Sequence, residues 1–291
     1  MLFKKFALLL CALVLCAGCA NAEVISLPVD DTPGLPVNPA FYLDEYHYQD
    51  PSIEVTIEKT HWVKSDVYLA RVKIADPSQL RTASAYGFDR KQVAAVKDMA
   101  NRMNAVVAIN GDYCYYQMST STCYLVRQGK LYSDMMAKGR DMLLIDDKGD
   151  LTILQGASKE KLDEYSHLNL INTFSFGPGL VVDGQPLDPE YDYKFNGSLD
   201  RHQRAAICQV EKGKMEYIFA VSEGNHESDG GGLTLHEWSA FLMTLGVQNA
   251  YNLDGGNSTA LIFGGEKINA VKNHRHRKIS DIIYFASAYQ E

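Results

Sequence analysis

The chain has 291 residues, 46% of them hydrophobic and 22% charged, which excludes a disordered, collagen-like or coiled-coil protein and allows one domain with a sizeable core. Asp and Glu number 36 against 28 Lys and Arg, giving a formal net charge of −8. This acidic balance, without a long basic run, argues against nucleic acid or an anionic membrane surface as a partner.

The first residues predict a secretory signal. Two lysines precede an apolar run at 6–17, which is too short to cross a bilayer comfortably as a helix. The small-x-small triplet at 20–22 predicts cleavage after residue 22, so that 1–22 would be removed. A second interpretation ends the signal before Cys19, as in a bacterial lipoprotein, where a lipid on this cysteine would be the only attachment to a membrane. Both interpretations place the domain outside the cytoplasm, either secreted or lipid-anchored at the cell surface.

Three cysteines follow the signal. Cys114 and Cys123 flank a polar Ser/Thr stretch at 119–122, and a disulfide between them is expected in an oxidising compartment; the alternative is two unpaired thiols. Cys208 lies within an apolar strand pattern and is expected to be a buried thiol. No spacing of Cys and His resembles a zinc site.

Residues 23–50, rich in proline, are expected to form a linker, and the domain itself is expected at 51–291. Alternating or continuous apolar runs predict strands at 53–58, 67–74, 105–109, 123–127, 142–146, 151–154, 205–210, 217–221, 250–253, 261–263 and 279–286. Helices are predicted at 89–104, 158–165 and 234–245, the last with a capping box between Thr234 and Glu237. Because the helices do not alternate regularly with the strands, we predict a single-domain α+β fold with a mixed β-sheet and two main helices packed on it.

Two of the predicted strands end in polar and glycine residues. Asn110-Gly111-Asp112 follows the strand at 105–109, and the segment 254–258, Asp-Gly-Gly-Asn-Ser, follows the strand at 250–253. Side chains at such ends sit on a rigid edge, and glycines let backbone N–H groups face a ligand. The alternative for each segment is a simple turn, since Asn-Gly is a strong turn dipeptide.

Several charged residues are further candidates. Arg204 immediately precedes the strand at 205–210, and its planar guanidinium suits a phosphate or carboxylate; the alternative is a surface ion pair. His202 is a candidate acid or base, although a lone His is commonly a surface residue. We expect no cofactor; the alternative is Ca²⁺ or Mg²⁺ held by Asp112 and Asp254, which are hard oxygen ligands.

These segments, in this order, resemble the phosphodiester glycosidase family. The resemblance runs over roughly 94–285 and rests on the segments 108–113, 177–180 with Gly184, 204–207, 232–237, 245–246, 252–258 and Arg277. Asn257 stands where the family commonly has a third glycine. Cys208 stands where the family usually has a glycine after the isoleucine of the segment 204–207. Both differences indicate a divergent subgroup.

The resemblance implies an extracytoplasmic hydrolase that cleaves a sugar-1-phosphodiester at the anomeric carbon, with a phosphorylated carbohydrate, a cell-envelope glycan or an exopolysaccharide as partner. Carboxylates stabilise the oxocarbenium-like centre of such a cleavage. We therefore expect Asp112 and Asp254 as the catalytic carboxylates and Arg204 as the phosphate clamp. The substrate-binding candidates are Asn110, Gly111, His202, Gly255, Gly256, Ser258 and Glu237.

Two other classes of function fit the sequence. A non-catalytic glycan-binding module on the same fold would present a shallow aromatic groove with exposed carboxylates, and the tyrosines near residue 113 suit sugar faces. A structural envelope protein would present an exposed apolar patch and no convergent polar pocket. The arrangement of Asp112, Arg204 and Asp254 discriminates among the three.

Overall fold

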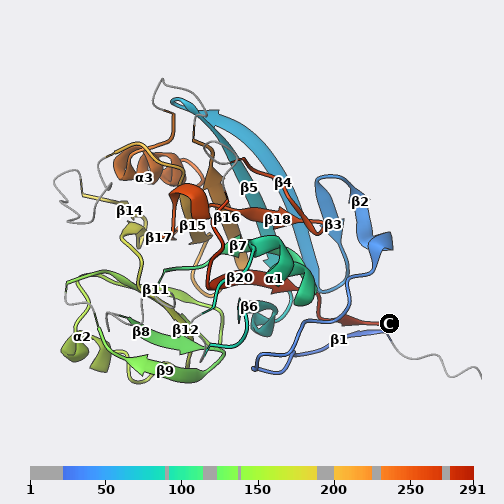
Figure 1. Cartoon of the computed structure of the whole chain (residues 1–291). Helices are drawn as coiled ribbons and strands as arrows, with labels where there is room; N and C mark the ends of the chain where they lie inside the picture. The colour runs from blue at the N-terminus through green and yellow to red at the C-terminus, as the bar shows by residue number, and fades with distance from the viewer. Residues whose placement is uncertain are drawn as a thin grey trace, which may run out of the picture.

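The computed structural model describes residues 22–88, 92–113, 123–136, 139–188, 200–224, 231–270 and 276–291. Its largest element is a nine-stranded sheet (Figure 1). The strands of this sheet, in spatial order, are β14 (Gln185–Pro186), β13 (Gly179–Val182), β17 (Asn249–Leu253), β15 (Ala205–Gln209), β16 (Glu216–Ser222), β5 (Ser65–Ile74), β4 (Ile53–Trp62), β3 (His47–Gln49) and β2 (Tyr42–Asp44).

A five-stranded sheet packs against one face of the nine-stranded sheet. Its strands, in spatial order, are β19 (Glu266–Lys267), β18 (Leu261–Phe263), β7 (Ala105–Asn110), β20 (Asp281–Ala286) and β6 (Leu80–Ser84). The main core lies between the two sheets, where Phe219 of β16 meets Phe285 of β20 with ring centroids 4.9 Å apart. Burial of these facing apolar surfaces is the largest favourable contribution to folding.

One helix covers the outer face of each sheet. Strand alternation explains this, because Ile207 of β15 faces the core between the sheets while Ala206 faces the other way. On that outer face α3 (Leu235–Met243) inserts the fully buried Trp238. The helix α1 (Val96–Arg102) buries Met99 against the outer face of the five-stranded sheet. The layers therefore run helix, sheet, sheet, helix.

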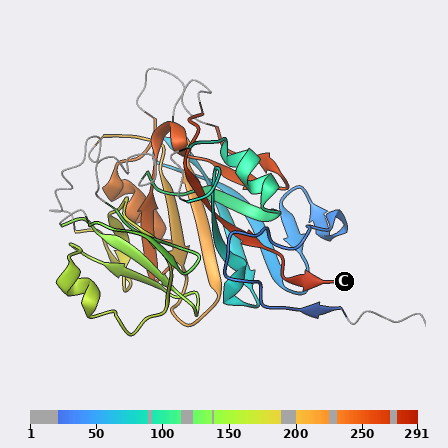
Figure 2. The ribbon, with the colours of Figure 1, turned by 60° about the horizontal axis from the view of Figure 1, so that its bottom comes forward.

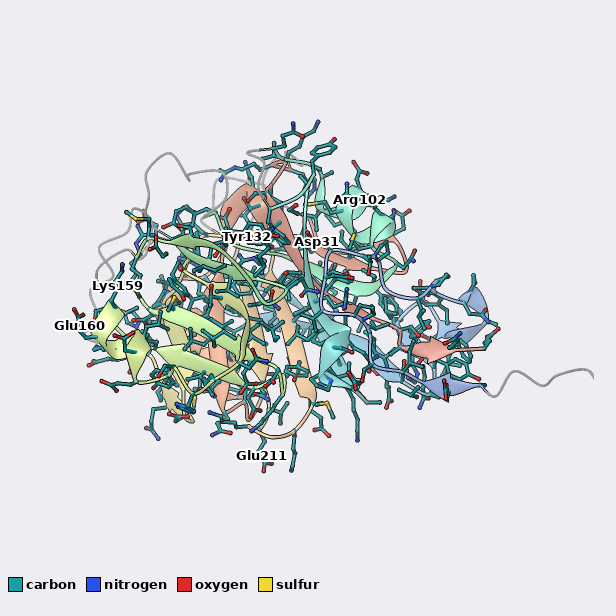
Figure 3. All side chains as sticks on the ribbon, turned by 90° about the horizontal axis from the view of Figure 1, so that it is seen from below. Asp31, Arg102, Tyr132, Lys159, Glu160 and Glu211 are labelled. Atoms are coloured by element: carbon teal, nitrogen blue, oxygen red, sulfur yellow. The ribbon has the colours of Figure 1, made fainter. Side chains whose placement is uncertain are left out.

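Smaller sheets complete the domain. A three-stranded sheet consists of β11 (Leu151–Leu154), β10 (Met142–Asp146) and β12 (Leu170–Phe174), and a hairpin of β8 (Tyr124–Arg127) and β9 (Lys130–Asp134) lies beside it. Together with α2 (Lys159–Asp163), these strands form a lobe on the side of the molecule away from β1–β3 (Figure 2). Charged side chains project outward from the periphery, among them Glu160 of α2 and Glu211 after β15 (Figure 3).

The α+β class and the single domain are confirmed, but the strand directions differ from the mixed sheet predicted. Every strand ladder among the described residues is antiparallel. The reason is that each main helix connects two strands of the same direction with a third strand inserted between them. The strands β6 and β7, connected through α1, both pair with β20, and β16 and β17, connected through α3, both pair with β15.

The segment 23–50, predicted to be a linker, is part of the domain. The strand β1 (Glu23–Val24) pairs with the C-terminal β21 (Tyr289–Gln290), and β2 and β3 extend the nine-stranded sheet (Figure 1). Three backbone carbonyls of this segment accept hydrogen bonds from the buried Arg81 guanidinium. The linker prediction was wrong because the prolines of this segment belong to an ordered, non-repetitive path over the core and not to a flexible one.

The predicted helices and strands are otherwise found, with shifted ends. The helix predicted at 89–104 is shorter, since α1 spans Val96–Arg102, and residues 89–91 lie outside the described residues. The capping box at Thr234 and Glu237 is present. The signal at 1–21 also lies outside the described residues, and within those residues no helix is long and apolar enough to cross a bilayer.

Replacing Leu27 by Ala tests whether the N-terminal segment contributes to the core. Leu27 is 5% exposed and belongs to the buried cluster that includes Met99 of α1, so we expect a loss of about 2–5 kcal/mol in the free energy of unfolding. Urea denaturation measures this loss. The control Val29→Ala, at a side chain that is 49% exposed, should change it by less than about 0.5 kcal/mol. Equal effects of both variants would mean that the segment is loosely attached.

Candidate active site

The ends of β7 and β17 lie side by side although they belong to different sheets. Asn110, the last residue of β7, donates from its side-chain amide to the Asp254 carbonyl at 2.7 Å. Its side-chain oxygen accepts from the Ala260 N–H at 3.1 Å, and the Asp254 N–H donates to the Gly111 carbonyl at 3.3 Å. The amide of this fully buried asparagine thus joins the two strand ends.

A pocket of about 460 Å³ opens at this junction. The described residues that line it are Val93, Asp112, Tyr113, Asp254, Arg277, Lys278, Ile279 and Ser280. Two carboxylates from the two strand ends therefore share one pocket with two cationic side chains, which come from the segment before β20. The structure brings Asp112 and Asp254 together, while Arg204 does not line this pocket.

Asp254 has an unusual electrostatic environment. Burial raises the pKa of its carboxyl group above the ordinary value, because the charged form loses solvation. The Ser258 hydroxyl and the charge of Arg277 oppose this rise, and the charge of Asp112 adds to it. A carboxyl group of raised pKa that faces a pocket is a stronger base than an ordinary aspartate.

Asp112 is held on both of its oxygens. Its Oδ2 accepts from the Ser175 backbone N–H at 3.0 Å, and its Oδ1 lies 3.4 Å from the guanidinium of Arg127. The same guanidinium lies 2.8 Å from Oδ2 of Asp281. All three charged side chains of this cluster are almost completely buried. Asp112 is therefore a fixed carboxylate at the edge of the pocket.

Glycine is required at two places beside the carboxylates. A Cβ at Gly111 would overlap the Asp281 carboxylate and lie 3.1 Å from the Asp281 carbonyl oxygen. A Cβ at Gly255 would lie 2.6 Å from the Gln203 carbonyl oxygen. Gly256 adopts a positive φ of 61° and donates its N–H to that same carbonyl at 2.9 Å. These glycines let neighbouring strands approach the site closely.

Arg204 is directed to backbone carbonyls. Its Nε donates to the Leu233 carbonyl and its terminal nitrogen to the Asp200 carbonyl, both at 2.8 Å. Burial lowers the pKa of the guanidinium to about 10, and the charge of Asp200 opposes this change. The contacts hold the chain that leads into α3. The role of phosphate clamp, expected for Arg204, stays a prediction without a pocket contact.

His202 and Glu237 also lie among the supports of α3. The His202 backbone exchanges hydrogen bonds with Leu233 as an isolated bridge. One carboxylate oxygen of Glu237 accepts from the Thr234 N–H at 3.0 Å, and the other accepts from Arg201. Neither His202 nor Glu237 lines the pocket of Asp112 and Asp254. Their expected contacts with substrate stay predictions.

Two of the three cysteines that follow the signal lie within the described residues. Cys123 is disulfide-bonded, and Cys114, its expected partner, lies outside the described residues. Cys208 is a free and fully buried thiol, as predicted. In the part of the chain that the structure describes, no three His, Cys, Asp or Glu side chains are grouped to hold a metal ion. The expectation that no cofactor is needed stays a prediction.

Sequence reasoning missed Arg127 and Asp281 and gave Arg277 no role. The first two are charged residues inside apolar strand patterns, Leu-Val-Arg at 125–127 and Asp-Ile-Ile at 281–283. A charge in such a position is costly unless it is paired, and this was the available signal. Arg277 entered the sequence analysis only as part of the family resemblance, which gave no indication of the strand end that it faces.

The fold and the pocket define an α+β domain in which two antiparallel sheets bring paired carboxylates and cations to one edge. The chain belongs to the phosphodiester glycosidase family, whose model matches residues 103–286. This match confirms the resemblance drawn from the sequence.

Two curated proteins are similar in sequence. The chain is 25% identical over 272 residues to the SPbeta prophage-derived uncharacterized protein YomE of Bacillus subtilis (strain 168), covering 90% of this chain and 40% of that protein. It is 26% identical over 220 residues to the N-acetylglucosamine-1-phosphodiester alpha-N-acetylglucosaminidase of Mus musculus, covering 69% and 41%. The chain thus spans about two fifths of the length of these relatives.

Two solved structures share the fold. The zebrafish N-acetylglucosamine-1-phosphodiester alpha-N-acetylglucosaminidase catalytic domain, auto-inhibited by its pro-peptide, matches with a TM-score of 0.66 and 18% identity, covering 91% of this chain and 98% of that one. A hypothetical protein from Synechocystis matches with a TM-score of 0.54 and 16% identity, covering 80% and 62%. At these identities the likeness concerns the fold alone.

Replacing Gly111 by Ala tests the close approach of β20 to the site. The new methyl group would overlap the Asp281 carboxylate, so we expect the free energy of unfolding to fall by about 3 kcal/mol or more. Thermal denaturation compares this variant with Gly184→Ala, which has no atom within 4 Å of the new Cβ and carries only the strain of a positive φ, roughly 1–2 kcal/mol. A Gly111 variant as stable as the control would contradict the packing described.

Proposed function

We propose that this protein is a hydrolase that cleaves a sugar-1-phosphodiester at the anomeric carbon. One observation carries the proposal: Asp112 and Asp254 share a pocket of about 460 Å³ with Arg277 and Lys278. Membership of the phosphodiester glycosidase family supports the same chemistry. Paired carboxylates suit glycosidic cleavage, and adjacent cations suit the phosphate that leaves.

The environments of the two carboxylates favour different roles. Asp112, held by Arg127 and the Ser175 N–H, is placed to stabilise the positive charge that develops at the anomeric carbon. Asp254 has a pKa raised by burial, which suits a general base that takes a proton from the attacking water. The phosphate monoester is a good leaving group, so little help from a general acid is needed.

The cations of the pocket are proposed to bind the phosphodiester. The guanidinium of Arg277 has the planar donor geometry that matches phosphate oxygens, and Lys278 adds a second positive charge. Arg277 is exposed, and its backbone N–H donates to the Asn257 carbonyl at 2.9 Å, next to Ser258. We assign Arg277 the clamp role first expected for Arg204, since Arg277 lines the pocket, whereas Arg204 does not line it and donates to the Leu233 and Asp200 carbonyls.

An aromatic wall is proposed to receive the sugar ring. Tyr113 lines the pocket directly beside Asp112. Its ring packs edge-on against Phe176 at a centroid distance of 5.4 Å, and the guanidinium of Arg140 lies 5.3 Å from its centre. Such packing fixes the orientation of the tyrosine ring. A fixed aromatic face beside a carboxylate is a common way to bind a sugar ring.

The substrate is proposed to be a phosphorylated carbohydrate of the cell envelope or an exopolysaccharide. The secretory signal predicted at 1–22 supports an extracytoplasmic site of action. Attachment to a membrane would then come only from a lipid on Cys19. The alternative of a glycan-binding module is less well supported, because such a module would expose its carboxylates, whereas Asp112 is 2% exposed.

Replacing Asp254 by Asn tests the assignment of the base. We expect kcat for a sugar-1-phosphodiester to fall about 10²–10⁴-fold, because the amide cannot accept the proton. In the wild type, kcat/KM should fall as the pH drops through the raised pKa of Asp254, and therefore at a higher pH than the ordinary aspartate value of 3.8 would give. Steady-state kinetics across pH measures both effects. The control Asp163→Asn, on the exposed face of α2, should keep full activity. Equal activity of the Asp254 variant would refute the assignment.

Replacing Arg277 by Gln distinguishes the two candidate clamps. A hydrogen bond to a charged group contributes roughly 1.5–3 kcal/mol, so KM for the phosphodiester should rise about tenfold or more. The acid limb of kcat/KM should also move to higher pH, because Arg277 normally opposes the raised pKa of Asp254. Arg204→Gln should lower stability and leave KM of the folded protein unchanged. A KM that rises only for the Arg204 variant would restore Arg204 as the clamp.

A further inference from the structure

Arg127 is the most completely enclosed charge near the pocket. It ends β8, in the side lobe, and its side chain is fully buried between the strand ends of β7 and β20. The guanidinium carbon lies 4.1 Å from the centre of the Phe174 ring. An arginine enclosed in this way does not reach substrate, so its function must act through the groups that it contacts.

All five N–H donors of Arg127 have acceptors. Two donate to Oδ2 of Asp281, from Nε at 3.1 Å and from a terminal nitrogen at 2.8 Å. That same terminal nitrogen also faces Oδ1 of Asp112 at 3.4 Å. The other terminal nitrogen donates to the carbonyls of Thr173 and Val126. The carbonyl contacts fix the plane of the guanidinium, and the two carboxylates share its remaining donors.

The cluster holds one positive and two negative groups in a site without solvent. Its charge balances only when one carboxyl group carries a proton. Asp281 is the better placed of the two, because the hydrogen bonds from Arg127 reach only its Oδ2, whereas both oxygens of Asp112 are held by donors. Burial raises the pKa of Asp281 to about 7, with the charge of Arg127 opposing the rise and that of Asp112 adding to it. Below this pH Asp112 is therefore the charged carboxylate that pairs with the guanidinium.

We propose that Arg127 and Asp281 are positioning residues for Asp112: Arg127 fixes the orientation of the Asp112 carboxylate at the pocket, and the charge of Asp281 governs how fully Arg127 is committed to it. The inference rests on the proposed function, because Asp112 acts there as the stabilising carboxylate. Among the described residues, the charged side chains that share the pocket with Asp112 are Asp254, Arg277 and Lys278. None of these three accepts from or donates to Arg127 in the hydrogen bonds described.

The main test compares Asp281→Asn with the wild type across pH. Ionisation of Asp281 draws Arg127 away from Asp112, so wild-type kcat should fall as the pH rises through about 7. The amide of the variant stays neutral, so this basic limb should disappear, and kcat at pH 6 should stay within about threefold of the wild type. A basic limb near pH 7 that persists in the variant would overturn the role of Asp281.

The second variant, Arg127→Lys, keeps the charge and removes the planar fork. We expect kcat to fall at least tenfold with KM changed less than threefold, because orientation is lost while substrate contacts remain. Arg81→Lys is the matched control: Arg81 is 1% exposed, lies on β6 of the five-stranded sheet and donates to backbone carbonyls and the Tyr284 hydroxyl. It should lose stability and keep kcat. Equal effects of the two lysine variants on kcat would reduce Arg127 to a structural role.

A measurement without substrate separates this inference from the proposed function. Carboxyl ¹³C NMR of the free protein should show one aspartate that titrates near pH 7, and this signal should be absent in Asp281→Asn. Asp112→Asn should move that titration to lower pH, since the like charge is removed. These shifts in a wild type that hydrolyses no phosphodiester would refute the proposed function and keep the coupled cluster. An unshifted titration in an active enzyme would refute the cluster and keep the function.

Discussion

The candidate pocket opens where one buried amide joins two sheets. The carboxylates of the candidate site stand on strands that share no ladder, and their relative position depends on the layer packing and on the hydrogen bond from Asn110 to the Asp254 carbonyl. The amide of Asn110 also accepts from Ala260, so its orientation is fixed from both sides. A buried amide with satisfied donors and acceptors specifies one arrangement, because any other leaves polar groups unpaired at a cost of about 1–3 kcal/mol each.

The buried charges beneath the pocket also specify one arrangement, because an unpaired buried charge costs more free energy than an unpaired amide. Burying Arg127 with two carboxylates costs solvation that the ion pairs only partly return, so such a cluster is a poor source of stability. Its value is geometric, because the loss of Arg127 would leave two buried carboxylates without their shared cation. The cluster joins β8 of the side lobe to the end of β7 and the start of β20 in the five-stranded sheet. The lobe is thereby coupled to the site although it contributes no pocket residue from β8.

Sequence patterns predicted the elements of this domain and the two strand ends well, because burial on both faces leaves continuous apolar runs that stop where a strand stops. They do not give the direction of a side chain or the path of a segment where a long-range contact decides it. Arg204 and Arg277 both adjoin apolar strands, and only the packing reveals that Arg204 turns to the base of α3 while Arg277 faces Asp254. The prediction of a linker at 23–50 was wrong for the same reason, since backbone carbonyls of this segment accept hydrogen bonds from Arg81, which lies far along the chain.

The two halves of the site are built alike. Each carboxylate follows the second strand of a helix-connected pair, and in each case the inserted antiparallel strand begins beside it. On one side the Gly111 N–H donates to the Asp281 carbonyl at 2.9 Å, and on the other the Gly256 N–H donates to the Gln203 carbonyl at 2.9 Å. A glycine without space for a Cβ lies at each contact, Gly111 itself on the first side and Gly255, next to Gly256, on the second. The difference lies in the charge that each inserted strand brings. The strand β20 begins with Asp281, which shares the arginine of Asp112. The strand β15 follows Arg204, which donates to backbone carbonyls, so that burial is the largest influence on the pKa of Asp254. One scaffold thus gives two carboxylates different electrostatic environments, which is the requirement for one to stabilise charge while the other moves a proton.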